Sequence, residues 1–321
     1  MPCYHPLAVR YIDGKFAGFV GPYTPALHSD TYGEYVRVPC GHCVGCRIDR
    51  AKRWSDRMLL EFDTVRDYGK RKALFLTLTY DPEHLPLVTC TDKQVRGNLR
   101  QKDMQDFLKR IRKKFSDRKL RYFYSGEYGD QTFRPHYHMI MYGCTLDDFP
   151  DAEVYSYDSK MQSSLYVSSI LDSIWKNGSV KFAPATYGTF SYVGKYVLKK
   201  QWGDNALFYR GRTPPFCRMS LKPALGSDFF GPDISYTKVC VPDPDGDKKI
   251  HEIELPRVVL DKLRASDPDL YDNIMAVRRA IAQSHSEMRE QQSDLDFFSQ
   301  LRLDEQRLKD KIKSTSHRDK V

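Results

Sequence analysis

The first half of the chain alternates between helix-like and strand-like hydrophobic patterns. Apolar residues recur at helical spacing over 48–68 and again over 104–115, which predicts two amphipathic helices. Between them, the apolar segment "ALFLTLTY" (73–80) is rich in β-favouring residues and ends at an Asp-Pro pair. This composition predicts a buried strand that stops at a turn.

The next segments predict a β-hairpin followed by mixed elements. "LRYFYSGEYG" (120–129) and "HYHMIMYG" (136–143) look like two strands joined by a polar turn. Three further elements are expected: a helix at 164–175, a strand at 179–185 and a helix at 190–200. The order is β-α-β-β-α-β-α. We therefore expect an α+β fold, with helices packed on an antiparallel sheet in a βαββαβ-like order.

The pattern weakens beyond Gln201. A turn at Asp245-Gly246 predicts a hairpin, and a charged helical pattern starts near Pro268. The polar tail after Lys309 is expected to be disordered.

Charge adds a candidate partner to this fold. The formal net charge is +9, and residues 47–121 alone hold 21 Lys/Arg against 11 Asp/Glu. We expect cationic residues of the first two helices to bind DNA phosphates, although such runs are also typical of solvated faces: Arg50, Arg53, Arg57, Lys109, Arg110, Lys113 and Lys114. Mean hydropathy is −0.60, and no apolar run suits a membrane span or a secretory signal. We expect an intracellular protein without a membrane partner.

The sharpest local motif is His136-Tyr137-His138 within a predicted strand. Because side chains alternate across a strand, both imidazoles project on one face and can reach one ion. Glu127 on the neighbouring strand adds a carboxylate, with Asp130 and Glu83 as rivals, and such a set suits Mg²⁺ or Mn²⁺. The alternative is a pair of histidines satisfied by hydrogen bonds.

The second motif is "YVGKYVLKK", in which Tyr192 and Tyr196 lie one helical turn apart. The apolar stripe of this helix lies elsewhere, so the core does not need the two tyrosines. A phenol is a poor nucleophile unless a cation or base activates it, and Lys195 and Lys199 are candidates for this role. The alternative is that both tyrosines only pack.

Clustered cysteines predict a structural metal site. Cys40, Cys43 and Cys46 follow a C-x2-C-x2-C spacing, and Cys3 supplies a fourth thiol. We expect Zn²⁺ bound by these four, with His5 and His42 as substitute ligands and an iron–sulfur cluster as the main rival. The scattered cysteines are interpreted as structural: Cys90, Cys144, Cys217 and Cys240.

Together, "FLTLTY", "EYGDQTFRPHYHMIMYG" and "YVGKYVLKK" resemble the three ordered motifs of the HUH endonucleases. With "VPCGHCVGCR" in front and "RMSLKPALG" behind, the chain resembles more narrowly the replication initiators of gokushovirus-type microviruses, single-stranded DNA phages. The resemblance covers about residues 1–226.

This resemblance implies a rolling-circle initiator that nicks and joins single-stranded DNA. His136, His138 and Glu127 would hold the catalytic ion, and Tyr192 and Tyr196 would attack the origin phosphate in turn, each leaving a 5′-phosphotyrosine. It divides the chain into a Cys-rich zinc lobe with a basic helix (1–70), an HUH endonuclease domain (71–226) and a C-terminal hairpin with a helical extension (227–321).

The expected partner is the single-stranded replication origin, in the cytoplasm of a bacterial host. No G-x4-G-K-[ST] motif is present, so host helicase and polymerase are expected partners. Two alternatives stay open. One is a non-catalytic, zinc-containing nucleic-acid-binding protein, and the other is a plasmid relaxase or transposase of the same superfamily.

Overall fold

The computed structural model describes residues 3–13, 15–24, 34–64, 72–129, 131–158, 163–196, 207–228, 238–244, 249–291 and 293–318. The chain forms two compact units. Residues Met1–Arg50 and Arg278–Val321 make the first, and Ala51–Val277 make the second. The predicted segments 1–70, 71–226 and 227–321 cut across these units, and as functional domains they stay a prediction.

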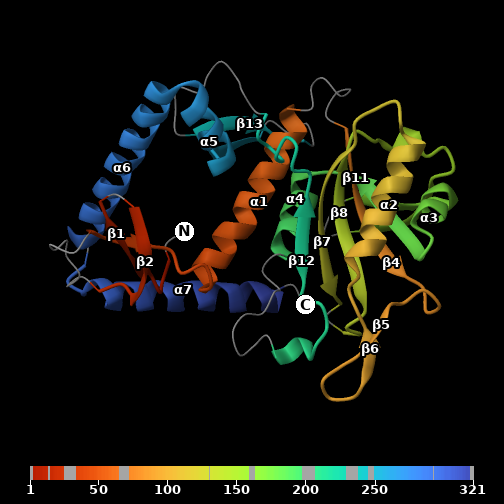
Figure 1. Ribbon diagram of the computed structural model, residues 1–321, viewed down its shortest axis with the longest axis horizontal. Helices are drawn as coiled ribbons and strands as arrows, with labels where there is room; N and C mark the ends of the chain where they lie inside the picture. The colour runs from red at the N-terminus through yellow and green to blue at the C-terminus, as the bar shows by residue number, and fades with distance from the viewer. Residues whose placement is uncertain are drawn as a thin grey trace. The chain divides into compact units, whose positions relative to one another are not determined.

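A seven-stranded sheet forms the centre of the second unit (Figure 1). Its order is β12-β7-β8-β4-β11-β10-β9, and all neighbours are antiparallel. The strands are β4 (Ala73–Tyr80), β7 (Arg121–Tyr128), β8 (Pro135–Tyr142), β9 (Glu153–Asp158), β10 (Ser163–Val167), β11 (Gly178–Pro184) and β12 (Phe216–Met219). The α+β class, the antiparallel sheet and the β7–β8 hairpin are therefore confirmed.

Helices cover both faces of this sheet. Helices α2 (Gln101–Lys114) and α3 (Ser169–Trp175) lie on one side, and α1 (Val44–Thr64) and α4 (Tyr187–Lys195) on the other (Figure 1). Alternation along β4 separates two apolar cores, because Leu74, Leu76 and Leu78 join the α2/α3 side. Phe75 instead joins the core formed with α1 and α4.

Two predicted helices differ from the observed ones. Residues 163–167 form strand β10, paired with β9, so the helix predicted at 164–175 is wrong in its first part. The helix begins only after Ser168, whose hydroxyl accepts the backbone N–H of Leu171 as an N-cap. Helix α4 begins at Tyr187 rather than at residue 190, because Thr186 and Thr189 form a capping box.

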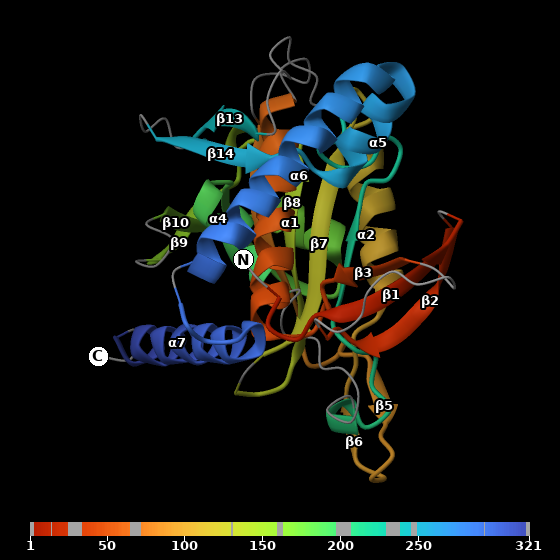
Figure 2. The same cartoon turned by 90° about the vertical axis from the view of Figure 1, so that its left-hand side faces the viewer.

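Smaller elements complete the second unit. Strands β5 (Leu87–Thr89) and β6 (Val95–Gly97) form a hairpin that projects beyond one end of the large sheet (Figure 2). Strands β13 (Lys238–Pro242) and β14 (Ile250–Glu254) pair antiparallel, as in the predicted hairpin, and the predicted turn at Asp245-Gly246 lies outside the described residues. The single-turn helix η2 (Leu146–Asp148) and helix α5 (Arg257–Ser266) also belong to the second unit.

The first unit carries a small antiparallel sheet of order β2-β1-β3. Its strands are β1 (Leu7–Ile12), β2 (Lys15–Pro22) and β3 (Glu34–Val38). Helix α6 (Pro268–Gln291) crosses the boundary between the units, and α7 (Phe297–Arg318) belongs to the first. The described residues after Lys309 are helical, which differs from the predicted disordered tail. Among the residues that the structure describes, no helix combines the length and apolarity that crossing a membrane requires.

Candidate metal and tyrosine site

The histidine pair lies on one face of β8, as the alternation predicted. His138 belongs to the side of the sheet that α4 covers, where its ring contacts Phe75, Tyr192 of α4 and the C-cap residue Tyr196. Tyr137 points to the opposite face and is fully buried in the α2/α3 core. Its hydroxyl accepts the backbone N–H of Arg100 at 2.8 Å and donates to the Arg100 carbonyl at 2.9 Å.

Both imidazoles present the same nitrogen to Glu127, which faces His136 across the β7–β8 pair. The Nε2 atoms of His136 and His138 lie 2.8 Å and 3.3 Å from Glu127 Oε1. The Nδ1 atoms are engaged elsewhere, 3.1 Å from the Arg134 carbonyl and 3.1 Å from Thr77 Oγ1 respectively. A hydrogen bond at Nδ1 that orients the ring and leaves Nε2 facing inward is typical of metal-ligating histidines.

The three side chains therefore fit a single divalent cation. Their ligand atoms lie within 4.8 Å of one another, and Glu127 and His138 are almost fully buried. Of the two rivals for the carboxylate, Glu83 is exposed and outside this group, and Asp130 lies outside the described residues. Two imidazoles and one carboxylate suit Mn²⁺ or Mg²⁺ when water completes the coordination.

Tyr192 of α4 and Tyr196, the residue that caps the C-terminal end of this helix, converge on this group. The Tyr196 ring stacks on His138 with centroids 4.4 Å apart, and the Tyr192 ring meets His138 edge-on at 5.2 Å. The two phenol rings are perpendicular to one another at 4.9 Å. Tyr192 is 37% exposed, whereas Tyr196 is only 8% exposed. The imidazole pair and the phenol pair thus lie together at one site. Tyr196 is more buried than its predicted position outside the apolar stripe suggested.

Close helix packing places α4 over the sheet. Phe190 and Val193 are fully buried in the core shared with α1. At Gly194 the two helices approach so closely that a Cβ would lie 2.8 Å from Ser55 Oγ and 2.9 Å from the Ala51 carbonyl. Only glycine allows this approach, and Tyr192 and Tyr196, two residues before and after it, contact His138.

The structure describes one of the two predicted cationic activators. Lys195 is the last residue of α4, and its side chain is exposed. Lys199 lies outside the described residues. Activation of Tyr192 or Tyr196 by these lysines therefore stays a prediction.

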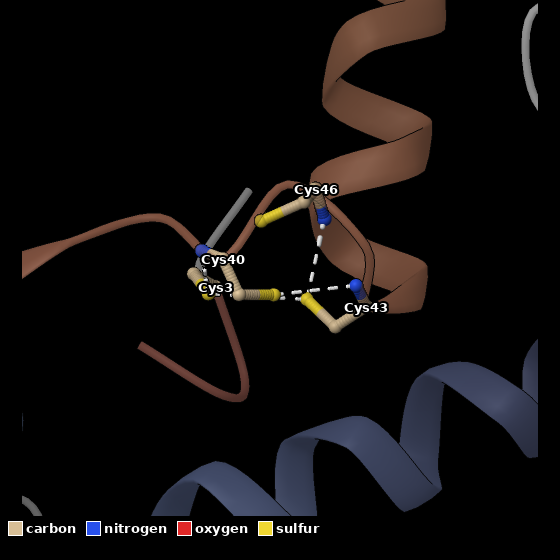
Figure 3. Close-up of side chains that lie close together, drawn as sticks. All are labelled: Cys3, Cys40, Cys43 and Cys46. Carbon is tan, nitrogen blue, oxygen red and sulfur yellow. Dashed lines mark hydrogen bonds between the residues drawn. The ribbon is translucent and has the colours of Figure 1, made fainter. Parts of the chain in front are cut away.

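Four cysteines of the first unit form a second candidate metal site (Figure 3). The sulfur atoms of Cys3, Cys40, Cys43 and Cys46 lie within 4.8 Å of one another, and Cys43 Sγ is 3.9 Å from Cys3 Sγ. Ligands at about 2.3 Å from one tetrahedral ion are about 3.8 Å apart, so this set fits a single ion. The two proposed substitute ligands, His5 and His42, lie outside this group. His5 instead pairs with Glu305 at 3.1 Å.

Backbone N–H groups around the cysteines favour thiolates. Cys40 N–H donates to Cys3 Sγ at 3.2 Å, and Cys43 N–H donates to Cys40 Sγ at 3.3 Å. At Cys43, burial raises the pKa of the thiol, but hydrogen bonds from the backbone of Cys46 and Tyr4 outweigh it and the net pKa is lowered. Burial raises the pKa of the Cys3 and Cys46 thiols. Deprotonation of Cys3 and Cys46 is therefore favoured by a bound cation.

The predicted DNA-binding cations separate into two groups. Arg57 is held in packing, since its guanidinium donates to the Leu225 carbonyl at 2.7 Å and burial lowers its pKa. Arg110 similarly donates to the carbonyls of Ile174 and Trp175 at the end of α3. Five others are exposed: Arg50, Arg53, Lys109, Lys113 and Lys114. The α2 lysines lie across the sheet from the histidines, so of these exposed cations in the second unit only Arg53 of α1 shares the side of the candidate site.

Sequence reasoning missed the residues that orient the site. Thr77 pairs with His138 in the sheet register and contacts its Nδ1, and Phe75 stacks on the same ring. Phe75 and Thr77 are two residues apart in "ALFLTLTY" and therefore share a face, but no pattern in β4 reveals that this is the histidine face. Gly194 carried no signal beyond being a glycine inside a predicted helix.

Comparison with known proteins supports the family resemblance that the sequence motifs indicated. Residues 73–201 match the family model of replication-associated protein ORF2/G2P. Replication-associated protein VP4 of Bdellovibrio phage phiMH2K is 27% identical over 270 residues, 81% of this chain and 78% of that protein. Replication-associated protein ORF2 of Spiroplasma virus 4 is 32% identical over 51% of this chain and 48% of its own length.

A third relative shows the same relationship. Replication-associated protein ORF4 of Chlamydia phage 1 is 26% identical over 83% of this chain, which spans 58% of that protein. No solved structure matches the chain. The predicted resemblance to replication initiators of microvirus-type phages is therefore confirmed.

Proposed function

We propose that this protein initiates rolling-circle replication by nicking and joining single-stranded DNA through its two tyrosines. Its relatives are replication-associated proteins of phages. The observation that carries the chemistry is the packing of Tyr192 and Tyr196 against His138, which itself faces Glu127. A nucleophile and a cation site held together are what phosphodiester transfer requires.

Each residue has a distinct part in this reaction. The phenol of Tyr192 or Tyr196 gives up its proton as its oxygen attacks the scissile phosphorus, the bond to the 3′ oxygen breaks, and that oxygen takes up a proton. The product is a 5′-phosphotyrosine with a free 3′-OH, so the phosphodiester energy is kept for rejoining. A divalent cation held by His136, His138 and Glu127 would supply charge stabilisation at the phosphate.

Two tyrosines at one site make the joining step possible. While the first remains esterified, the second cleaves the regenerated origin, and the released 3′-OH attacks the first phosphotyrosine to close a circle. The perpendicular contact of the two rings at 4.9 Å supports this use of one site in turn.

The decisive experiment is adduct formation. The protein is incubated with Mn²⁺ and labelled single-stranded origin DNA, and a denaturation-resistant complex is sought by gel electrophoresis. Each single Tyr→Phe variant should keep part of the adduct, and the double variant should lose it. Replacing His136 or His138 should also abolish it. Adduct formation by the double variant would refute the assignment of the nucleophiles.

The same experiment separates the alternatives. A non-catalytic nucleic-acid-binding protein would bind the DNA equally well with both tyrosines changed to Phe and would never form an adduct. A plasmid relaxase or transposase would form the adduct on its own substrate rather than on a phage origin. The match to the phage family favours the origin as substrate.

We further propose that the four cysteines hold a structural Zn²⁺. The close spacing of their sulfur atoms favours one ion over an iron–sulfur cluster, in which thiolates bound to different irons lie further apart. The proposed partners are the single-stranded origin and a host helicase and polymerase, and the proposed location is the cytoplasm of the bacterial host.

A further inference from the structure

A row of side chains leads from His138 toward the far edge of the sheet. In the register of the strands, His138 of β8 pairs with Thr77 of β4, and Thr77 pairs with Lys181 of β11. Val180 and Phe182 are fully buried in the α2/α3 core, so Lys181 between them projects onto the face of His138. Two strand spacings place the backbones of Lys181 and His138 about 10 Å apart.

An exposed tyrosine extends this row beyond Lys181. The Lys181 Nζ atom lies 3.9 Å from the centroid of the Tyr155 ring, and Tyr155 is 55% exposed. Tyr155 lies at a β-bulge, since Tyr166 pairs with Val154 and Leu165 pairs with Ser156, which leaves Tyr155 as the extra residue of β9. Bulges re-aim side chains, and this one turns Tyr155 toward Lys181.

We propose that Lys181 and Tyr155 form a subsite for single-stranded DNA beside the metal and tyrosine site, an inference that rests on the proposed function. The Lys181 ammonium neutralises a phosphate, and the Tyr155 ring stacks on an unpaired base. A cation and an exposed aromatic ring in line with the metal ligands fit an oligonucleotide that continues from the scissile phosphate. Exposed aromatic rings and cations are the elements from which single-strand grooves are built.

The strand also supplies a matched control. Tyr157 is 64% exposed and pairs with Ser164, which is two residues from Tyr166 and therefore on the same face. Tyr166 packs against the α2/α3 core and pairs with Phe182. Tyr157 thus belongs to the face opposite to Tyr155, on the same strand and with similar exposure.

The test is the binding of a fluorescent single-stranded oligonucleotide, measured by anisotropy without added divalent cations over a range of salt concentrations. Tyr155→Ala should weaken binding at least about fivefold, and Tyr155→Phe should not, because stacking needs only the ring. Lys181→Gln should weaken binding and reduce the magnitude of the slope of log affinity against log salt by about 0.7. Tyr157→Ala should bind like the wild type.

Each outcome has one meaning when thermal melting shows that the variants are folded. Equal losses for Tyr155→Ala and Tyr157→Ala, or none for either, overturn the subsite, as does an unchanged salt slope for Lys181→Gln. Wild-type protein that binds no single-stranded DNA instead overturns the proposed function. Wild-type binding with a selective loss in Tyr155→Ala supports the subsite whatever the adduct experiment gives.

Discussion

The imidazole ring of His138 lies flat against the phenol ring of Tyr196, with centroids 4.4 Å apart and an interplanar angle of 9°. A residue of the sheet and the C-cap residue of helix α4 are thus in direct contact. On its other sides His138 contacts Thr77 and Phe75, so β4 also fixes the ring. Side chains held by such packing keep reacting groups in position without reorganisation, which is how enzyme sites gain much of their rate.

Gly194→Ala should move α4 away from His138. The new methyl group would meet the Ala51 carbonyl of α1, which is backbone and cannot rotate away. We expect a loss of about 1–3 kcal/mol in the free energy of unfolding, as for other overpacked contacts. Adduct formation should fall by a larger factor than stability explains. Urea denaturation and the gel assay measure the two effects.

Gly188→Ala is the control for that change, because it lies on the same helix and its Cβ would meet only the Thr186 side chain at 3.3 Å. It should leave adduct formation near the wild-type level. If Gly194→Ala were as active as Gly188→Ala, the close approach of α1 and α4 would not be what positions the tyrosines.

Substitutions of two neighbouring residues of β8 should have opposite effects on stability and on adduct formation. Tyr137→Phe removes a buried hydroxyl that bonds to the Arg100 backbone and to Tyr80, so stability should fall by about 1–3 kcal/mol. Adduct formation under conditions where the variant is folded should persist. His136→Gln, on the other face and partly exposed, should abolish metal-dependent adduct formation with little change in stability. Loss of activity in both variants at equal stability would contradict the assignment of faces.

The sequence predicted the centre of this fold well because its strands are long and buried. The predicted bounds of strand β4 match the observed ones at both ends. The alternation in His-x-His correctly predicted that His136 and His138 face one side of the sheet and Tyr137 the other. Strand β10 was mistaken for helix because Leu165, Tyr166 and Val167 have no clear alternation and pair along a bulged neighbour. Short strands near the edge of a sheet depend on such tertiary pairing rather than on local pattern.

The candidate site was predictable only as far as ligand chemistry goes. The residue types and spacing of Glu127, His136 and His138 indicated a cation site, and the structure groups them. The burial of Arg57 and Arg110 was not predictable, because their carbonyl acceptors lie more than 60 residues away in the chain. Sequence charge alone does not distinguish a cation that caps a helix from one that faces solvent.

Purified protein should contain one zinc ion per chain by elemental mass spectrometry, without the visible absorption of an iron–sulfur cluster. Cys40→Ser should lose the zinc and destabilise the first unit, because a structural zinc site contributes folding free energy. Cys240→Ser, an exposed cysteine outside the cluster, should keep it. Iron with visible absorption in the wild type would instead establish the rival cluster.

Asp151 should make the protein lose stability in acid. Burial opposes its ionisation, but hydrogen bonds from the Ile170 backbone and the hydroxyls of Ser168 and Ser169 outweigh it and lower the pKa of Asp151 to about 2. A carboxyl whose pKa is lower in the folded state stabilises the fold above its ordinary pKa, and that stabilisation is lost as pH falls from about 4 to about 2. Asp151→Asn should therefore be less stable than the wild type at neutral pH and should lose less stability on acidification, as urea denaturation at several pH values will measure.

The control is Glu153→Gln, which changes an exposed carboxylate on the adjoining strand and should follow the wild-type curve. Parallel acid curves for the wild type and Asp151→Asn would show that this carboxylate does not anchor the start of α3.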